Sequence, residues 1–227
     1  MERGLYIAAS GMLAEQVRQN QIANDLANAS TPGYKSDRSS QRSFSELLLH
    51  NTSTGENIGA LGTGVTIAQT VTDLDPASLR DTGEPLDFGI EGTGFFGVRT
   101  AQGIRYTRNG QFMRSPQGTL TDALGNQVLG QNGRPISVRA DGTAATTPGV
   151  FNVPNARKQG DSLFTGTPSG RATGTARSGS LEASGTDPAR AMIDMISSER
   201  SYEAGQKVMR TIDETLQKAV QSVPSIG

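Results

Sequence analysis

The sequence predicts an α+β protein in which a long helix at each end of the chain flanks a central antiparallel β domain. Two observations predict the helices: residues 3–29 contain no proline, and apolar residues recur every seven positions from Met195 onward. A third predicts the β domain: the middle of the chain is rich in Gly, Thr, Ser and Val, with short apolar runs between turn signals. We therefore expect an N-terminal helical segment (residues 1–35), a β-rich segment (36–182) and a C-terminal helical segment (183–227).

The N-terminal helix is predicted to carry a narrow apolar seam. Leu5, Met12 and Leu26 are spaced at multiples of seven residues, and polar Gln19 occupies the missing position. This spacing places the three apolar side chains along one side of a helix. The Thr-Pro-Gly turn that follows should end the helix, because Pro32 disfavours helical geometry at the residue before it.

The central segment is predicted from its turns. Asn109-Gly110, Asn132-Gly133 and Asp141-Gly142 are pairs that supply the positive φ values of tight hairpins. The expected strands are residues 65–71, 86–90, 95–99, 104–107, 127–129 and 136–138. Residues 155–180 are rich in Gly, Ser, Thr and Arg, so we expect an extended return segment there.

The C-terminal helix is the clearest element. Asp187-Pro188 is a favourable start, with Asp as the N-cap and Pro at the first helical position, and Pro224 should end the helix. The residues that recur every seven positions are Met195, Tyr202, Met209 and Leu216, and Gly205 and Ile212 belong to a companion line three positions further on. Such a pattern is typical of a coiled-coil-like seam. Its partner is either the N-terminal helix or another copy of the chain.

Composition excludes several classes of function. The net charge is −1 and no long basic run occurs, so nucleic-acid binding is not expected. The chain has no cysteine and one histidine, which excludes thiolate metal sites, cysteine nucleophiles and histidine metal pairs. We also expect neither a transmembrane helix nor a cleaved secretory signal. Hydrophobic residues make up only 34%, so part of the chain should find its apolar contacts in a partner.

One motif imitates an enzyme site. Gly92–Gly97 matches the G-x-G-x-x-G dinucleotide pattern, but Phe95 to Val98 continue as a strand where that pattern requires a helix. We interpret it as a glycine-bent hairpin. Asp87 and Glu91 should share one face of a strand, which we interpret as a solvated sheet face. The sequence therefore predicts no catalytic site, cofactor, metal or small-molecule substrate.

Three segments resemble the flagellar rod and hook protein family. The N-terminal signature comprises Asn24, Leu26, Ala27, Asn28, Thr31, Pro32, Gly33 and Tyr34. Residues 86–96, 106–110 and 125–130 are similar to the family's β domain, and residues 179–184, 192–196 and 200–203 resemble its C-terminal signature. Gly185-Thr186 departs from the family's usual Asn-Val, and Thr93 stands where a polar or acidic residue is common.

The resemblance implies a structural subunit of the basal-body rod that transmits torque and is not an enzyme. It implies export by the flagellar type III apparatus, terminal helices packed into an inner tube, and a β domain in an outer layer. Expected partners are copies of the chain, other rod and hook axial proteins, and the export apparatus. The expected assembly residues are Leu5, Met12, Leu26, Met195, Tyr202, Met209, Ile212 and Leu216.

Two alternatives stay open. Residues 106–110 and 135–136 favour a proximal rod protein, whereas residues 62–65 resemble the distal one. A secreted adhesin, with a β domain on a helical stalk, is an alternative of a different class. Removing one terminus separates the two classes, because a stalked adhesin should stay folded whereas a rod subunit should lose assembly.

Overall fold

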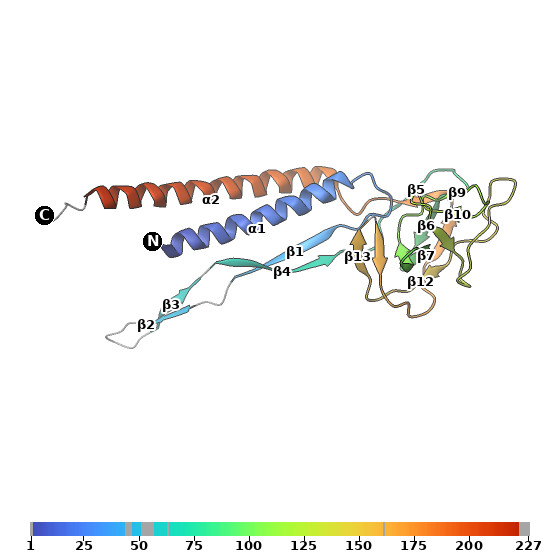
Figure 1. Ribbon diagram of the computed structural model, residues 1–227, viewed down its shortest axis with the longest axis horizontal. Helices are drawn as coiled ribbons and strands as arrows, with labels where there is room; N and C mark the ends of the chain where they lie inside the picture. The colour runs from blue at the N-terminus through green and yellow to red at the C-terminus, as the bar shows by residue number, and fades with distance from the viewer. Residues whose placement is uncertain (1, 44–46, 51–56, 63, 161, 223–227) are drawn as a thin grey trace. The chain divides into compact units, whose positions relative to one another are not determined.

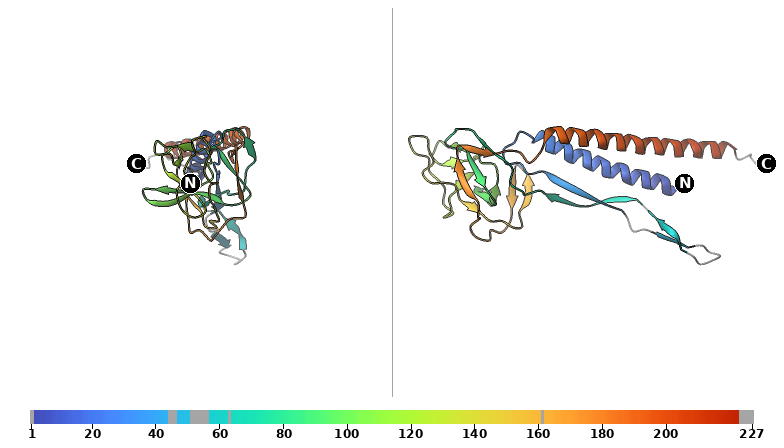
Figure 2. Two further views of the ribbon diagram at one scale, coloured as in Figure 1. Left: turned by 90° about the vertical axis from the view of Figure 1, so that its right-hand side faces the viewer. Right: turned by 180° about the vertical axis from the view of Figure 1, so that it is seen from behind.

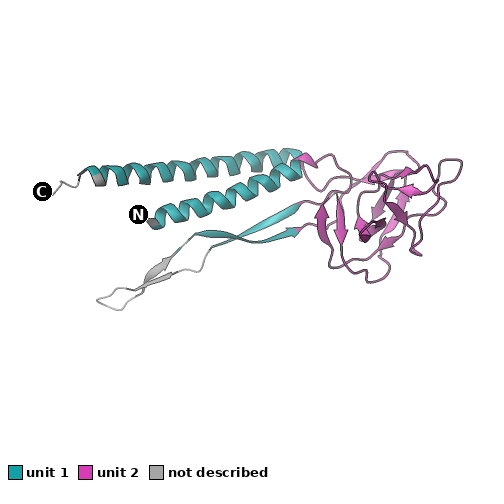
Figure 3. Cartoon of the chain, in the orientation of Figure 1, with its two compact units in different colours: residues 1–26, 37–71, 188–227 teal, residues 27–36, 72–187 magenta. Residues whose placement is uncertain are grey.

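A computed structural model of the chain describes residues 2–43, 47–50, 57–62, 64–160 and 162–222. In these residues a long helix is followed by a series of strands and a second long helix, which confirms the predicted fold class (Figure 1). The chain divides into two compact units, coloured separately in Figure 3. Unit 1 comprises residues 1–26, 37–71 and 188–227, and unit 2 comprises residues 27–36 and 72–187.

The two helices have nearly the predicted bounds. Helix α1 spans Glu2–Ala27 and α2 spans Pro188–Ser222, so α2 begins at the proline that the sequence indicated. Helix α1 ends two residues earlier than expected, at a turn in which the Thr31 amide donates to the Asn28 carbonyl at 3.0 Å. The predicted helix end at Pro224 falls outside the described residues.

Within unit 1, α1 and α2 lie side by side in antiparallel orientation (Figure 2). Three contacts fix this direction, and they pair Gly4 with Ile212, Met12 with Gly205, and Glu15 with Ser198. A Cβ atom at Gly205 would lie 2.8 Å from Met12 Cγ, so glycine lets the two helices approach closely. The Ser198 hydroxyl donates to Glu15 Oε2 at 2.6 Å.

The described residues between Asp37 and Val71 contribute to two antiparallel strand pairs that belong with the helices in unit 1. Strand β1 (Asp37–Ser43) pairs with β4 (Val65–Thr72), and β2 (Leu47–His50) pairs with β3 (Asn57–Leu61). The Val65 amide donates to Ser10 Oγ at 3.3 Å, and the Gln21 side-chain amide donates to the Asp37 carbonyl. The sequence grouped these strands with the central domain because periodicity within a strand does not show which element the strand contacts.

Unit 2 is built on one antiparallel sheet. Its strand order is β13-β14-β8-β7-β11-β10-β9, and β12 also pairs with β7. These strands are β7 (Phe95–Thr100), β8 (Gly103–Thr107), β9 (Met113–Arg114), β10 (Leu120–Thr121), β11 (Gln127–Leu129), β12 (Val150–Phe151), β13 (Arg157–Gly160) and β14 (Leu163–Thr165). Two further antiparallel pairs join β5 (Leu79–Asp81) to β16 (Ser180–Glu182) and β6 (Phe88–Glu91) to β15 (Thr175–Ser178).

The expectation of an extended return segment at residues 155–180 was wrong. Strands β13 and β14 form a hairpin there, and β14 joins the sheet beside β8. Phe164 is 1% exposed, and its ring lies 5.2 Å from that of Phe95. One large aromatic side chain in contact with an existing sheet anchors this hairpin, although the polar residues around it gave no strand signal.

Three further features predicted from the sequence, the glycine pattern, the acid at position 87 and the last short strand, differ in part from the structure. In the glycine pattern at residues 92–97, Gly92 and Gly94, with positive φ values of 101° and 126°, lie in the turn between β6 and β7, and Phe95 continues as strand β7 as predicted. The predicted hairpin was wrong, because β6 pairs with β15 and β7 pairs with β8, β11 and β12. Asp87 is buried rather than solvated. In the expected strand at residues 136–138, Ser137 and Val138 form isolated bridges instead.

The core of unit 2 is apolar and lies against its sheet. Its main cluster contains Phe88, Ile90, Phe96, Val98, Phe112, Leu120, Val128, Ile136, Val138, Val150 and Ala172. A second cluster contains Phe95, Tyr106, Val153 and Phe164. Close packing makes each of these side chains sensitive to truncation.

Leu120 and Leu124 form a matched pair for testing this core. Leu120 is 0% exposed and Leu124 is 63% exposed. We expect Leu120→Ala to lower the free energy of unfolding of unit 2 by about 2–5 kcal/mol, because it leaves a cavity. Leu124→Ala should change it by less than about 0.5 kcal/mol. Urea unfolding followed by tyrosine fluorescence measures both, and equal effects would contradict this core assignment.

A buried junction of the two terminal segments

The N-terminal signature forms a tight turn directly after α1. The Thr31 hydroxyl donates to Asn28 Oδ1 at 3.2 Å, and the Tyr34 amide donates to the Thr31 carbonyl at 3.3 Å. Gly33 has φ of 64°, a conformation that glycine adopts without strain. The signature therefore encodes a tight turn within the first segment of unit 2.

The backbone of Gly33 also lies directly against other segments of unit 2. Its amide donates to the Glu182 carbonyl at 2.9 Å. A Cβ atom at this position would collide with the backbone carbonyl of Arg108. A glycine is therefore required here for two separate reasons, a positive φ and a close backbone approach.

Tyr34 is buried beside the turn and has contacts on two sides. The Lys158 ammonium lies 4.1 Å from the centre of the Tyr34 ring, a cation–π contact. The same ammonium donates to the Lys35 carbonyl at 2.8 Å, and the Gly185 amide donates to the Tyr34 carbonyl at 2.8 Å. The turn is thus bonded to the segment that precedes α2.

At the centre of this junction, a buried carboxylate pairs with two buried cations. Glu182 Oε1 lies 2.6 Å from Lys35 Nζ, and Glu182 Oε2 lies 2.9 Å from Arg108 Nη1. All three side chains are at most 1% exposed. The Ala77 amide also donates to Glu182 Oε1 at 2.8 Å. We call Lys35, Arg108 and Glu182 the buried triad.

The two cations have further partners, and these are uncharged. Lys35 Nζ donates to the Asp75 carbonyl at 2.6 Å, and Arg108 Nη2 donates to the Gly92 carbonyl at 3.0 Å. Arg108 Nε is buried without a hydrogen-bond partner. Ion pairs removed from water are costly to form, and losing one partner of such a pair destabilises a protein by about 3–5 kcal/mol. Glu182 is therefore the group on which both cations depend.

Part of this junction is made of residues from the N-terminal signature. Thr31, Pro32, Gly33 and Tyr34 lie in it, together with Asn28, whose carbonyl accepts the Ser184 hydroxyl at 3.0 Å. Asn24, Leu26 and Ala27 lie on the last turns of α1. The buried triad was missed as a site, although each member stands in or beside a segment that carried the family resemblance.

Two of the predicted assembly residues, Met12 and Ile212, contact the other helix in a single chain. Met12 lies against Gly205, and Ile212 lies against Gly4. All eight residues are half-buried: Leu5, Met12, Leu26, Met195, Tyr202, Met209, Ile212 and Leu216. Of the two partners that the periodicity left open, the structure shows the N-terminal helix. A contact of these residues with another subunit stays a prediction.

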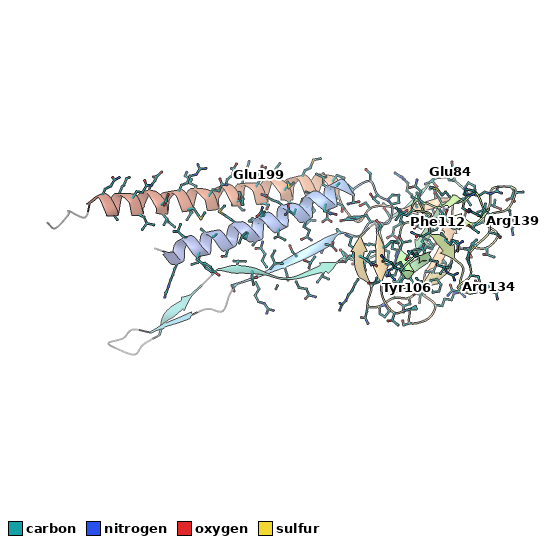
Figure 4. All side chains as sticks on the ribbon, in the orientation of Figure 1. Glu84, Tyr106, Phe112, Arg134, Arg139 and Glu199 are labelled. Atoms are coloured by element: carbon teal, nitrogen blue, oxygen red, sulfur yellow. The ribbon has the colours of Figure 1, made fainter. Side chains whose placement is uncertain are left out.

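A second apolar surface lies on the other side of α2. Ile193 is 68% exposed and Ile196 is 51% exposed, and with Arg200 and Ala204 they line a shallow groove of about 450 Å³. We call these four residues the outer face of α2. At 3.6 residues per turn, they lie nearly opposite the heptad residues that meet α1. Figure 4 shows that side chains, Glu199 among them, also project from α2 on the side away from α1.

Helix α1 also exposes large apolar side chains. Leu13 is 63% exposed, and Tyr6 and Val17 are exposed as well. Each helix of unit 1 therefore keeps apolar surface in contact with solvent in the single chain.

Two titratable groups of unit 2 have pKa values displaced from their ordinary ones. Burial raises the pKa of the Tyr106 phenol, and a hydrogen bond from the Thr143 hydroxyl lowers the pKa of the Asp141 carboxyl. Among the described residues, no group of three or more His, Cys, Asp or Glu could hold a metal ion. Neither α1 nor α2, as far as the structure describes them, has a stretch long and apolar enough to cross a membrane.

Three family models match consecutive parts of the chain. Residues 5–35 match the model described as "Flagella basal body rod protein". Residues 89–157 match "Flagellar hook protein FlgE/F/G D1 domain", and residues 177–222 match "Flagellar basal body rod FlgEFG protein C-terminal". Each of the three matched regions contributes one member of the buried triad.

Curated relatives match over nearly their whole length. The flagellar hook-basal body complex protein FlhO of Bacillus subtilis (strain 168) is 30% identical, and the match covers 100% of both chains. The flagellar basal-body rod protein FlgG of the same organism is 29% identical over 97% of this chain and 98% of its own. The flagellar basal-body rod protein FlgF of Salmonella typhimurium is 31% identical, with the same coverage of 97% and 98%.

Gly33 and Gly83 test the junction as a matched pair. Both have positive φ, 64° and 76°, but a Cβ atom at Gly83 would meet nothing within 4 Å. We expect Gly83→Ala to cost about 1–2 kcal/mol of unfolding free energy, from backbone strain alone. Gly33→Ala should cost a further 1–3 kcal/mol or so, because the Arg108 backbone must move. Urea unfolding measures the loss of unfolding free energy in both variants. Similar losses would show that the close approach of Gly33 to the Arg108 backbone is unimportant.

Proposed function

Because this chain belongs to the flagellar basal-body rod protein family, it is a structural subunit of the rod, and we propose that it polymerises through its terminal helices. The observation that carries the proposal is the pair of apolar faces on α2. One face meets α1 within the chain, whereas the outer face has no cover in the single chain. Exposed apolar surface of this kind is typical of an interaction site.

The proposed assembly uses both faces of the helix pair. The contact between α1 and α2 acts as a coiled-coil-like seam, whose small residues Gly4, Ser198 and Gly205 permit close approach. The outer face of α2 then contacts the exposed side of α1, near Leu13 and Val17, in a neighbouring copy or another rod or hook axial protein. Repeating this contact produces an inner tube layer with unit 2 outside it. The arrangement explains why apolar residues are only 34% of the chain.

Export and mechanics follow from the same family membership. We propose that the chain leaves the cell through the flagellar type III export apparatus and that the assembled rod transmits torque. We further propose that it has no catalytic activity and needs no cofactor, substrate or nucleic acid. The division into an N-terminal assembly helix (1–35), a central β-rich rod/hook-type domain (36–182) and a C-terminal assembly helix (183–227) also remains a proposal.

Substitutions on the two faces of α2 test the assembly proposal. We expect Ile193→Asp and Leu216→Asp each to abolish incorporation into rods and motility, because a charge would be buried at a subunit contact. The melting temperature of unit 2 should stay nearly unchanged, since its core lies elsewhere. Fractionation of basal bodies, with secretion measured in parallel, distinguishes failed assembly from failed export.

Gln217→Asp is the matched control, because Gln217 is an exposed polar neighbour of Leu216 on the same helix. This variant should be secreted and incorporated normally. If Ile193→Asp chains also enter rods at the normal level, the outer face is not an assembly surface. A large fall in the melting temperature of unit 2 for Leu216→Asp would assign the residue to monomer stability instead.

Within the rod, we propose the proximal position, on the basis of residues 106–110 and 135–136. The relatives named FlgG and FlgF have similar identities, 29% and 31%, so they do not favour either position. An epitope tag at residue Leu124, which is exposed on unit 2, should label the membrane-proximal part of isolated basal bodies by electron microscopy. Label at the hook-proximal end would instead establish a distal subunit.

A further inference from the structure

We propose that the buried triad makes closure of unit 2 depend on the arrival of Glu182, so that a chain emerging from its N-terminus keeps its junction open until its C-terminal segment is present. The inference concerns a single chain and does not depend on assembly into a rod. It assigns a role to Lys35, Arg108 and Glu182 that the family resemblance does not supply.

The first support is the order of the three residues along the chain. Lys35 precedes Glu182 by 147 residues, and Arg108 precedes it by 74 residues. Any process that releases the chain from its N-terminus therefore presents both cations before their shared carboxylate. This order holds during synthesis and during export of an unfolded chain.

The second support is the surroundings of the two cations. Apart from Glu182, their hydrogen-bond partners are the carbonyls of Asp75 and Gly92, which carry no net charge. Both cationic side chains are 1% exposed in the closed structure. Without Glu182, closing the junction would take two like charges out of water without the carboxylate that pairs with both of them, which is strongly unfavourable. Until the carboxylate arrives, the more favourable state keeps the cations hydrated and the junction open.

The third support is that the same carboxylate residue also bonds the backbone of the junction. Glu182 accepts the amides of Gly33 and Ala77, one through its carbonyl and one through Oε1. Strand β16, which ends at Glu182, also pairs with β5. Arrival of this one segment thus brings the counter-ion, two hydrogen-bond acceptors and an edge strand together. A chain that ends before Glu182 lacks all of them.

Hydrogen exchange of the full-length chain tests the requirement for the carboxylate, because Glu182→Gln keeps the shape of the side chain, removes its charge and replaces one of its two acceptor oxygens by an NH2 donor. We expect the amides of Gly33, Ala77 and Gly185, which bond across the junction, to exchange at least about 100-fold faster than in the wild type. The amides of Leu120 and Ile136, which bond within the core of unit 2, should keep their wild-type rates.

Asp81→Asn is the matched control. Asp81 Oδ1 pairs with Arg177 Nη2 at 3.0 Å, on strands β5 and β15, but both side chains are more than half exposed. The same change of acid to amide should leave all five exchange rates unchanged, because exposed ion pairs contribute little.

A triple variant separates charge from packing. This variant combines Lys35→Met, Arg108→Met and Glu182→Leu, so that neither buried cation remains to be neutralised. Such replacements of buried ion networks by apolar residues are often tolerated. We expect Gly185 exchange to return to within about 10-fold of the wild-type rate. If the Glu182→Gln chain fails to fold while the triple variant folds, the proposal also stands.

Four results would overturn it. The first is unchanged exchange in Glu182→Gln, and the second is equal acceleration of junction and core amides in that variant. The third is a triple variant that exchanges as fast as Glu182→Gln, and the fourth is failure of both variants to fold. None of these results bears on rod incorporation, so failure of this inference and failure of the assembly proposal are distinguishable.

Discussion

The carboxylate of Glu182 is the contact on which the junction of unit 2 depends. It holds Lys35, which follows the N-terminal turn, and Arg108, which follows β8, in one buried cluster. Because the backbone carbonyl of the same residue accepts the Gly33 amide, the two ends of unit 2 are bonded side by side. The chain continues from these ends into α1 and α2. A single acidic residue thus determines where the chain segments that lead into both helices leave the β unit.

The surroundings of the triad explain the short signature around it. Gly33 must be glycine because the Arg108 backbone lies against it, and Tyr34 covers the junction beneath the Lys158 ammonium. A buried ion cluster with one anion and two cations is weak as a source of stability. Its geometry joins three chain segments, because each carboxylate oxygen of Glu182 contacts one of the two cations. Each of the three regions that match the family models contains one member of the buried triad.

Periodicity and turn chemistry predicted much of the fold. The heptad line from Met195 and the Asp187-Pro188 start gave α2 within the described residues, and glycine turns gave most strands near the middle of the chain. The hairpin at β13 and β14 could not be predicted, because Phe164 is its one large buried side chain and, apart from Leu163, its other strand residues are polar or glycine. The buried triad was equally hidden. Charged residues far apart in sequence show no pattern that distinguishes a buried ion pair from three solvated side chains.

The same limit applies to the helices, where the heptad pattern predicted a seam but not its partner. Met12 against Gly205 and Ile212 against Gly4 show that the partner in a single chain is α1. Ile193 and Ile196, which a heptad analysis passes over, are left exposed on the opposite side. A helix with one apolar stripe is satisfied by one neighbour, whereas a helix with two stripes needs neighbours on both sides. An antiparallel pair within the chain therefore leaves apolar surface uncovered, and repeated subunits around a tube are one arrangement that covers it.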